Sequence, residues 1–245
     1  MVEGIRHVGE AAEAAAAGRV ELEYLVYAPD LLTSEFAASL VEQQVGRGVT
    51  CFSVPGDLFS SLADKQNPQG LLAVVRRPST HLARLTPQNF AWGVALLAPQ
   101  DPGNIGAILR TIDAVGASGL LLLDNSADPY HPSAVRASMG TIFWYPVVTA
   151  TFDEFVQWAS GHGYHIYGTS ARGSQDYHSV DNYSFPLVLL MGSEREGLSI
   201  DQVQRCHRLI SLPMEGRATS LNLAVATGVL LYDIYTKQTT RRPSD

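Results

Sequence analysis

The sequence predicts an α/β protein with two parts: a small amino-terminal α/β domain and a larger domain built on a mostly parallel sheet. Short apolar segments of strand length alternate with longer segments of helical periodicity, an order typical of parallel sheets covered by helices. The alternation is interrupted once, by RRPSTHLARLTPQN, which holds two prolines and little periodicity. We therefore expect a domain at 1–77, a linker at 78–90 and a second domain at 91–240.

The amino-terminal domain is expected to contain two helices and three strands. An Ala-rich segment predicts a helix that Gly18 ends, and Ser34 is placed to cap a second helix that ends in glycines. The remaining segments are rich in β-branched and aromatic residues. In chain order, the expected elements are a helix at 8–17, strands at 24–29 and 49–54 on either side of a helix at 34–48, and a strand at 71–75.

The second domain repeats strand, helix, strand with longer elements. Its first helix is expected to begin at Asn104 as N-cap and to end at Gly116. A stripe of apolar residues on this helix is expected to face the sheet: Ile105, Ile108, Leu109, Ile112 and Val115. Strands are expected at 92–99, 120–124, 137–148, 164–170, 186–192 and 208–213, with further helices at 151–163 and from about 220 to 237.

The last expected helix is so apolar that we predict it to be buried. Asn222 falls in its first turn, between Leu221 and Leu223. A buried amide without hydrogen-bond partners costs about 1 to 3 kcal/mol. The pattern therefore predicts that some group meets the Asn222 side chain, or that this side chain bonds to neighbouring backbone.

Composition limits the classes of function. A net charge of −7 argues against nucleic-acid binding by a bulk positive field, and residues 1–77 alone carry six basic and ten acidic side chains. By itself, the charge slightly favours a small-molecule enzyme. The chain has no apolar run of membrane length and no secretory pattern at residues 1–10, so we expect a cytoplasmic protein.

No metal or disulfide chemistry is expected from the sequence. Cys51 and Cys206 are far apart and lack a CxxC spacing, which predicts reduced thiols. His162 and His165 have no evident third ligand. We therefore expect no disulfide, no zinc site and no other metal site.

Three glycine-rich loops follow strands of the second domain, where this architecture places its ligands. They are APQDPGN at 98–104, MGSEREG at 191–197 and PMEGRATSLN at 213–222. None has the GxGxxG spacing of a dinucleotide fold or the GxxxxGK pattern of a phosphate loop. A ligand bound by backbone groups and apolar walls is therefore favoured over a polyphosphate cofactor.

Individual polar residues in this region allow two interpretations each. Arg110 lies opposite the apolar stripe, beside small residues, and is either a solvated arginine or a phosphate ligand next to another packed surface. Glu194 is either a surface acid or part of a site. Ser220 is either a helix cap or a site residue, but no His and Asp arrangement marks it as a nucleophile.

The three loops also carry ordered motifs of a known family. NIGAILRTIDAVGASGLLLLD resembles motif 1 of the SpoU (TrmH-like) RNA 2′-O-methyltransferases, LVLLMGSEREGLS resembles motif 2, and ISLPMEGRATSLNLAVATGVLLYD resembles motif 3. VRASMGTIFWYPV is similar to a segment between motifs 1 and 2. VEGIRHVGEA and NPQGLLAVV are similar to the ends of the small RNA-binding domain that many members carry. The resemblance thus covers nearly the whole chain.

The resemblance implies methyl transfer from S-adenosylmethionine to a ribose 2′-hydroxyl in structured ribosomal or transfer RNA, with ribosomal RNA preferred. It also implies a homodimer and a carboxyl-terminal trefoil knot, which general topology rules exclude. The residues implied around the reacting ribose are Asn104, Arg110, Glu194, Ser220 and Asn222. Those implied to line the cofactor pocket are Gly192, Ile210, Leu212 and Leu221. Gly216 is implied as the turn that lets the chain fold back over the cofactor.

The departures from the family pattern are small. Motif 2 has Ser193 where asparagine or alanine is common, and the amino-terminal domain is acidic for one that holds RNA. We therefore expect a local basic patch near the linker, made by Arg76, Arg77, Arg84 and Arg136. Two alternatives to the methyltransferase stay open at this point: an RNA-binding module that has lost catalysis, and a small-molecule α/β enzyme.

Overall fold

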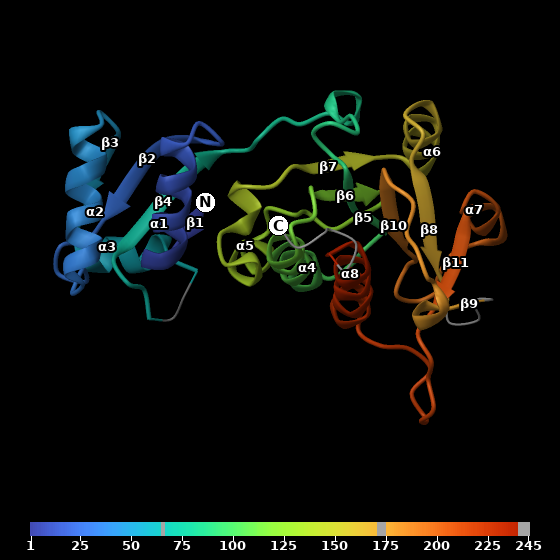
Figure 1. Cartoon of the computed structure of the whole chain (residues 1–245). Helices are drawn as coiled ribbons and strands as arrows, with labels where there is room; N and C mark the ends of the chain where they lie inside the picture. The colour runs from blue at the N-terminus through green and yellow to red at the C-terminus, as the bar shows by residue number, and fades with distance from the viewer. Residues whose placement is uncertain (65–66, 171–174, 240–245) are drawn as a thin grey trace. The chain divides into compact units, whose positions relative to one another are not determined.

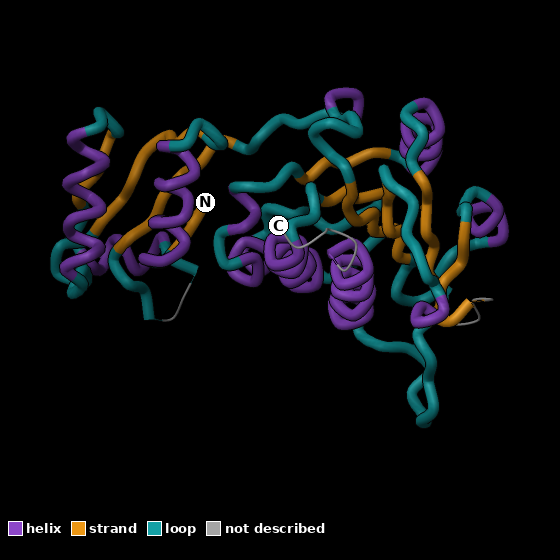
Figure 2. Tube along the Cα trace, viewed as in Figure 1, coloured by secondary structure: helices purple, strands orange, loops and turns teal. Residues whose placement is uncertain are grey.

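The computed structural model describes residues 1–64, 67–170 and 175–239. The chain forms two compact units, Met1–Ser79 with Met139–Trp144, and Thr80–Ser138 with Tyr145–Asp245. Figure 1 shows the elements of both units in chain order, and Figure 2 shows their helices and strands. Each unit has a sheet of its own.

The first unit contains a four-stranded sheet in the order β1-β4-β2-β3. Strands β2 and β3 are parallel, whereas β4 runs antiparallel to both β1 and β2. The strands are β1 (Val2–Glu3), β2 (Glu21–Tyr27), β3 (Thr50–Ser53) and β4 (Leu71–Arg76), and the helices are α1 (Ile5–Ala16), α2 (Glu35–Gly46) and α3 (Gly56–Leu62). The five predicted elements are present. The two unpredicted ones, β1 and α3, are too short to produce a periodic signal.

The second unit contains a seven-stranded sheet in the order β7-β6-β5-β10-β8-β11-β9, and all of its strand pairs are parallel. The predicted α/β class with a mostly parallel sheet is confirmed. The strands are β5 (Trp92–Leu97), β6 (Leu120–Leu123), β7 (Val147–Ala150), β8 (His165–Thr169), β9 (Gln175–Asp176), β10 (Leu187–Met191) and β11 (Arg208–Ser211). The α-helices are α4 (Pro102–Val115), α5 (Pro132–Ser138), α6 (Phe152–Gly161), α7 (Ile200–Gln204) and α8 (Leu223–Thr239), and short 3₁₀ turns are η1 (Leu82–Arg84), η2 (Thr141–Phe143) and η3 (Tyr177–Ser179).

Helices cover both faces of this sheet. Phe155 and Trp158 of α6 belong to a core cluster with side chains of β5, β6, β8 and β10. Figure 2 shows α4 and α8 on the side of the sheet opposite to α6. The predicted apolar stripe of α4 is fully or almost fully buried, and Gly116 ends the helix in the left-handed conformation with φ 68°. Both predictions for α4 are thus confirmed.

Two predictions about helix and strand boundaries are wrong. Asn104 is not the cap of α4, because the side chain of Asp101 accepts the hydrogen bond from Gly103 N at 2.8 Å and Pro102 occupies the first helical position. The predicted strand at 137–148 instead contains the end of α5, the η2 turn and irregular segments, and only its last two residues belong to β7. The apolar residues there serve helix packing, which a short apolar run does not distinguish from a strand.

The last helix also differs from its prediction. Helix α8 begins at Leu223, so Asn222 precedes the helix and is exposed. Only one side of α8 is buried, and Val225 and Tyr232 are 55% and 51% exposed. The apolar composition of this segment therefore did not establish complete burial, because apolar side chains also form surfaces on which another chain packs.

Within the three described stretches, no helix has both the length and the apolar character needed to cross a membrane. Cys51 and Cys206 are both free thiols.

Gly106 lets α4 and α5 approach closely. A β-carbon at this position would lie 2.3 Å from the carbonyl oxygen of Ala134 and 2.8 Å from Ser138 N. Both neighbours are backbone atoms of α5, which cannot move without shifting the helix. The small-residue face predicted around Arg110 is therefore packed against another element at its Gly106 end.

We expect Gly106→Ala to lower the free energy of unfolding by about 3 kcal/mol, the upper range for overpacking of a core. Urea denaturation would measure the change. Gly161→Ala is the matched control, because Gly161 is also helical but its added β-carbon meets no atom within 4 Å. Equal stability of the two variants would contradict the close approach of α4 and α5.

Candidate functional site

The three glycine-rich loops meet at the carboxyl edge of the seven-stranded sheet. They follow β5, β10 and β11, and in the sheet β5 pairs with β10, while β8 lies between β10 and β11. Because all four strands are parallel, their carboxyl ends lie along one edge. Motifs that are about 90 residues apart along the chain are therefore brought together.

Side chains from the three loops are joined to one another by hydrogen bonds. Asn104 Nδ2 donates to Glu194 Oε1 at 2.5 Å, and Asn222 Nδ2 donates to Asn104 Oδ1 at 3.0 Å. Asn104 therefore uses both ends of its amide, and it is only 7% exposed. We call these three hydrogen-bonded side chains, Asn104, Glu194 and Asn222, the Asn104 network. They are three of the five residues implied around the ribose.

The loop before α4 is built to leave Asn104 free for this role. Asp101 caps the helix, so the Asn104 side chain is not needed for capping. Gln100 Nε2 donates to the carbonyl oxygens of Ala98 and Asn125, both at 2.9 Å, and ties the loop to the one after β6. Ala98 has a φ of 44°, a conformation that a non-glycine residue adopts rarely and that concentrates at functional sites.

Glu194 lies at the tip of a tight turn. Ser193 and Gly197 exchange backbone hydrogen bonds of 3.0 Å in both directions, and the Ser193 hydroxyl accepts from Glu196 N at 3.2 Å. A β-carbon at Gly192 would lie 2.6 Å from the carbonyl carbon of Gly197. Only glycine at 192 thus lets the turn close on the end of β10 and hold Glu194 toward Asn104.

Asn222 has two functions at the start of α8. Its Oδ1 accepts hydrogen bonds from Ala224 N at 2.9 Å and Val225 N at 3.3 Å, which is the pattern of a helix N-cap. Its Nδ2 donates to Asn104. The expected bond to neighbouring backbone and the expected partner are both present, whereas Ser220 is exposed and does not cap the helix.

The segment from Leu212 to Leu221 connects β11 to α8 as an exposed loop. Within the described parts of the chain, residues 213–221 form no backbone–backbone hydrogen bond. Figure 1 shows this loop extending away from the sheet before the chain returns to α8. Gly216 lies in a bend there, but no contact within 4 Å of an added β-carbon requires glycine at this position. The loop thus offers free backbone donors and acceptors beside the network.

Three of the four residues implied for the cofactor pocket lie near one another at the sheet edge. Gly192 N donates to Thr169 Oγ1 at 3.4 Å, and Ile210 is paired with Thr169 in the parallel ladder. Leu212 follows β11 directly. Leu221 is at the far end of the exposed loop, just before α8, and is itself exposed.

Arg110 is not brought to the network within one chain. It lies six residues after Asn104 on α4, which turns it about 120° away and about 9 Å along the helix axis. Its side chain is exposed.

The expected basic patch needs a correction at Arg76. Arg76 forms ion pairs with Glu21 at 2.9 Å and Glu23 at 2.6 Å, and these carboxylates raise the pKa of its guanidinium. A guanidinium engaged by two carboxylates is a poor phosphate ligand. The patch therefore rests on Arg77, Arg84 and Arg136, for which it stays a prediction.

Sequence reasoning missed Asp101, Gln100 and Thr169. Asp101 was detectable, because Asp before Pro is a common start of a helix. Gln100 and Thr169 were not, because their partners come from other loops and strands.

An open parallel sheet with a polar network and an exposed loop at its carboxyl edge defines an α/β protein with a candidate ligand site at that edge. The chain belongs to the SpoU rRNA Methylase family, whose model matches residues 92–232. Residues 1–73 match the model of an MRM3-like substrate binding domain. The family resemblance of the three motifs is confirmed.

Individual relatives agree with this membership. The chain is 37% identical over 184 residues to the 23S rRNA (uridine(2479)-2′-O)-methyltransferase of Streptomyces viridochromogenes, covering 72% of this chain and 64% of the relative, slightly less than two thirds of its length. It is 31% identical to the 23S rRNA (guanosine(2553)-2′-O)-methyltransferase RlmP of Bacillus subtilis, covering 76% and 73% of the two chains. Among solved structures, an AdoMet-bound rRNA methyltransferase from Sinorhizobium meliloti superposes with a TM-score of 0.84 at 33% identity, covering 99% and 87% of the two chains. The SpoU methyltransferase AviRb from S. viridochromogenes gives 0.85 at 30% identity, covering 98% and 90%.

We expect Asn222→Ala to lower the free energy of unfolding by about 2 kcal/mol, because it removes a helix cap and a side-chain hydrogen bond. Asn222→Ser keeps a capping oxygen but cannot reach Asn104, so it should cost about 1 kcal/mol. Urea denaturation would compare both with Asn104→Ala and the double variants. Strict additivity of Asn104→Ala and Asn222→Ala would contradict a coupled network.

Proposed function

We propose that this protein catalyses S-adenosylmethionine-dependent 2′-O-methylation of one ribose in structured RNA, with ribosomal RNA as the preferred class. The observation that carries the proposal is the Asn104 network, which joins residues of all three family motifs at the sheet edge. The two curated relatives described above are named as 23S rRNA 2′-O-methyltransferases, which supports ribosomal RNA.

The residues at the sheet edge fit S-adenosylmethionine. Gly197 leaves its backbone uncovered, because an added β-carbon there would meet no atom within 4 Å. The half-buried Leu212 supplies apolar surface beside it, and residues 213–221 offer backbone groups that form no backbone–backbone hydrogen bond among the described residues. These groups suit an adenosine read by backbone and apolar walls. When bound, the cofactor supplies an activated methyl group. We propose that Gly192, Ile210, Leu212 and Leu221 hold it.

The remaining residues would orient the ribose and manage its proton. Alignment of the 2′-hydroxyl with the methyl group contributes most when the site is held rigid, which the Asn104 network provides. Glu194 is the acceptor suited to take the proton, directly or through water, and we propose that Ser220, on the exposed loop between β11 and α8, also contacts the ribose. Arginine is always charged, so Arg110 would hold a phosphate and stabilise the developing alkoxide rather than act as base.

We further propose a homodimer, in which the partner covers the exposed side of α8. Val225, Val229, Tyr232 and Tyr235 form a partly exposed apolar stripe on this helix. Stripes of this kind mark protein interfaces. A partner would also place a second surface beside the exposed Arg110. The carboxyl-terminal trefoil knot and the cytoplasmic location remain part of this proposal.

Arg110→Lys tests the role of the guanidinium. We expect kcat to fall about 100-fold, because lysine keeps the charge but loses the planar fork that donates two bonds. The assay is transfer of labelled methyl from S-adenosylmethionine to bulk RNA, with and without ribonuclease. Arg19→Lys, at an exposed position of the first unit, is the control. Near-full turnover of Arg110→Lys would contradict the bidentate role.

The same assay separates the alternatives. Cofactor binding by calorimetry with incorporation into no RNA would favour an RNA-binding module that has lost catalysis. Incorporation that resists ribonuclease would favour a small-molecule enzyme.

The dimer has a separate test. Tyr232→Glu places a charge in the proposed interface, and we expect it to halve the molar mass measured by light scattering after gel filtration. Val45→Glu adds a charge at another exposed apolar position, on α2, and should leave the mass unchanged. A wild-type protein that is monomeric at micromolar concentration would disprove the dimer.

A further inference from the structure

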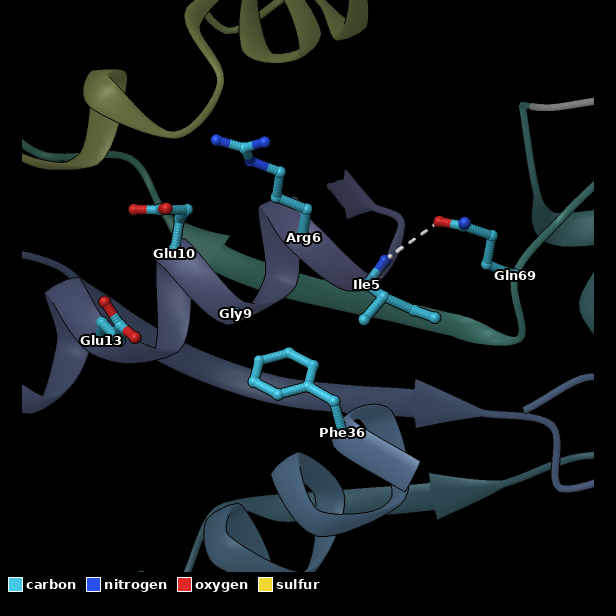
Figure 3. Close-up of a pocket in the computed structure, with 7 residues that line it drawn as sticks. All are labelled: Ile5, Arg6, Gly9, Glu10, Glu13, Phe36 and Gln69. Carbon is cyan, nitrogen blue, oxygen red and sulfur yellow. Dashed lines mark hydrogen bonds between the residues drawn. The ribbon is translucent and has the colours of Figure 1, made fainter. Parts of the chain in front are cut away.

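A groove of about 430 Å³ lies on the first unit, along one face of α1. Figure 3 shows its walls: side chains of α1, the Phe36 ring at the start of α2, and Gln69 just before β4. The lining residues are Ile5, Arg6, Gly9, Glu10, Glu13, Phe36 and Gln69. All belong to one unit, and none takes part in the candidate methyl-transfer site.

The groove has an aromatic wall, the Phe36 ring, which lies over the buried backbone of Gly9. Phe36 is 58% exposed, although it lies at the start of a helix whose other side is buried. A β-carbon at Gly9 would lie 3.5 Å from the Phe36 ring, so the ring contacts the helix where no side chain intervenes. The ring is thereby held in place with much of its surface open. An exposed aromatic ring of this kind suits the stacking of a flat ring.

The polar lining combines donors and acceptors. Gln69 Oε1 accepts a hydrogen bond from Ile5 N at 3.3 Å, so its amide group is left as a donor (Figure 3). Arg6 adds a guanidinium, and Glu10 and Glu13 add carboxylates. Steps of 100° place all of the α1 residues on one face of the helix. Within the part of the chain that the structure describes, neither Arg6 nor the two glutamates forms an ion pair.

These charges decide between classes of ligand. Two carboxylates in a unit with an excess of acidic residues oppose a phosphate, and Arg6 in the same groove opposes a cationic side chain. A neutral heterocycle with hydrogen-bond donors and acceptors on its edge is repelled by neither the carboxylates nor the guanidinium. Guanine offers adjacent N–H donors for a carboxylate and the acceptors O6 and N7 for a guanidinium or amide.

We infer that this groove binds an unpaired guanine of the RNA substrate, stacked on Phe36 and read by Arg6, Gln69 and the two glutamates. The inference rests on the proposed RNA substrate. It gives the acidic unit a way to bind RNA without phosphate neutralisation, because stacking and reading of base edges do not need a positive field.

The test uses the ¹⁵N-labelled full chain and nucleoside monophosphates, followed by the amide signals of Gln69 and Ile5. We expect guanosine monophosphate to shift these signals to saturation, and adenosine, cytidine and uridine monophosphates to shift them less. Inosine monophosphate lacks the 2-amino donor and should bind more weakly than guanosine monophosphate. Phe36→Ala should raise the dissociation constant of guanosine monophosphate about tenfold, within the range for loss of base stacking.

Matched variants localise the effect. Phe52→Ala removes an aromatic ring of similar exposure, 51%, on β3 of the same unit, and should leave the titration unchanged. Glu10→Gln with Glu13→Gln should remove the preference for guanosine over inosine monophosphate. Circular dichroism of each variant would show that it is folded.

Other outcomes overturn the inference. Equal shifts from all four nucleotides, or no shift, would contradict guanine recognition. A capped hexa-arginine peptide that moves the same signals at lower concentration would instead identify a protein-docking groove. The titration is independent of methyl transfer: if guanosine monophosphate binds as expected but RNA is not methylated, the proposed function fails and the groove assignment stands.

Discussion

The parallel pairing of β5, β10, β8 and β11 is the constraint on which the rest of the second unit depends. Every residue of β5 and β10 is buried, so the hydrogen bonds of these strands must be completed within the sheet. Parallel pairing then places every connecting loop at one of two edges. The loops that carry polar and glycine residues share the carboxyl edge, and this arrangement makes the contact between Asn104, Glu194 and Asn222 possible.

At that edge, neighbouring residues have different structural roles, and together these hold the candidate site in one conformation. Asp101 caps α4, which leaves the Asn104 amide free to bond Glu194 and Asn222. Asn222 caps α8 with its oxygen and reaches Asn104 with its nitrogen. Each polar group that supports the fold thereby also orients one that serves the site, so loss of stability and loss of function are expected to be coupled here.

The two units differ in the kind of recognition that their charges permit. The second unit presents an exposed loop and an exposed arginine at and near the sheet edge, whereas the first carries an excess of acidic side chains and neutralises Arg76 internally. A unit of that charge gains little from phosphates and must rely on stacking and directional hydrogen bonds. Its groove beside Phe36 supplies both, which links an acidic composition to specific rather than bulk binding.

The sequence by itself determined the α/β class, the apolar stripe of α4, the glycine that ends it and the family, because periodicity, caps and motifs are local properties. It did not determine that Asp101 rather than Asn104 caps α4, that residues 137–146 belong to a helix end and a turn, or that α8 keeps an open apolar side. The partners of Asn104 and Asn222 lie 90 and 118 residues away. Only the tertiary structure decided these caps, boundaries and hydrogen-bond partners, because they depend on which segments pack together. A local sequence pattern carries no information about the distant segment that it will contact.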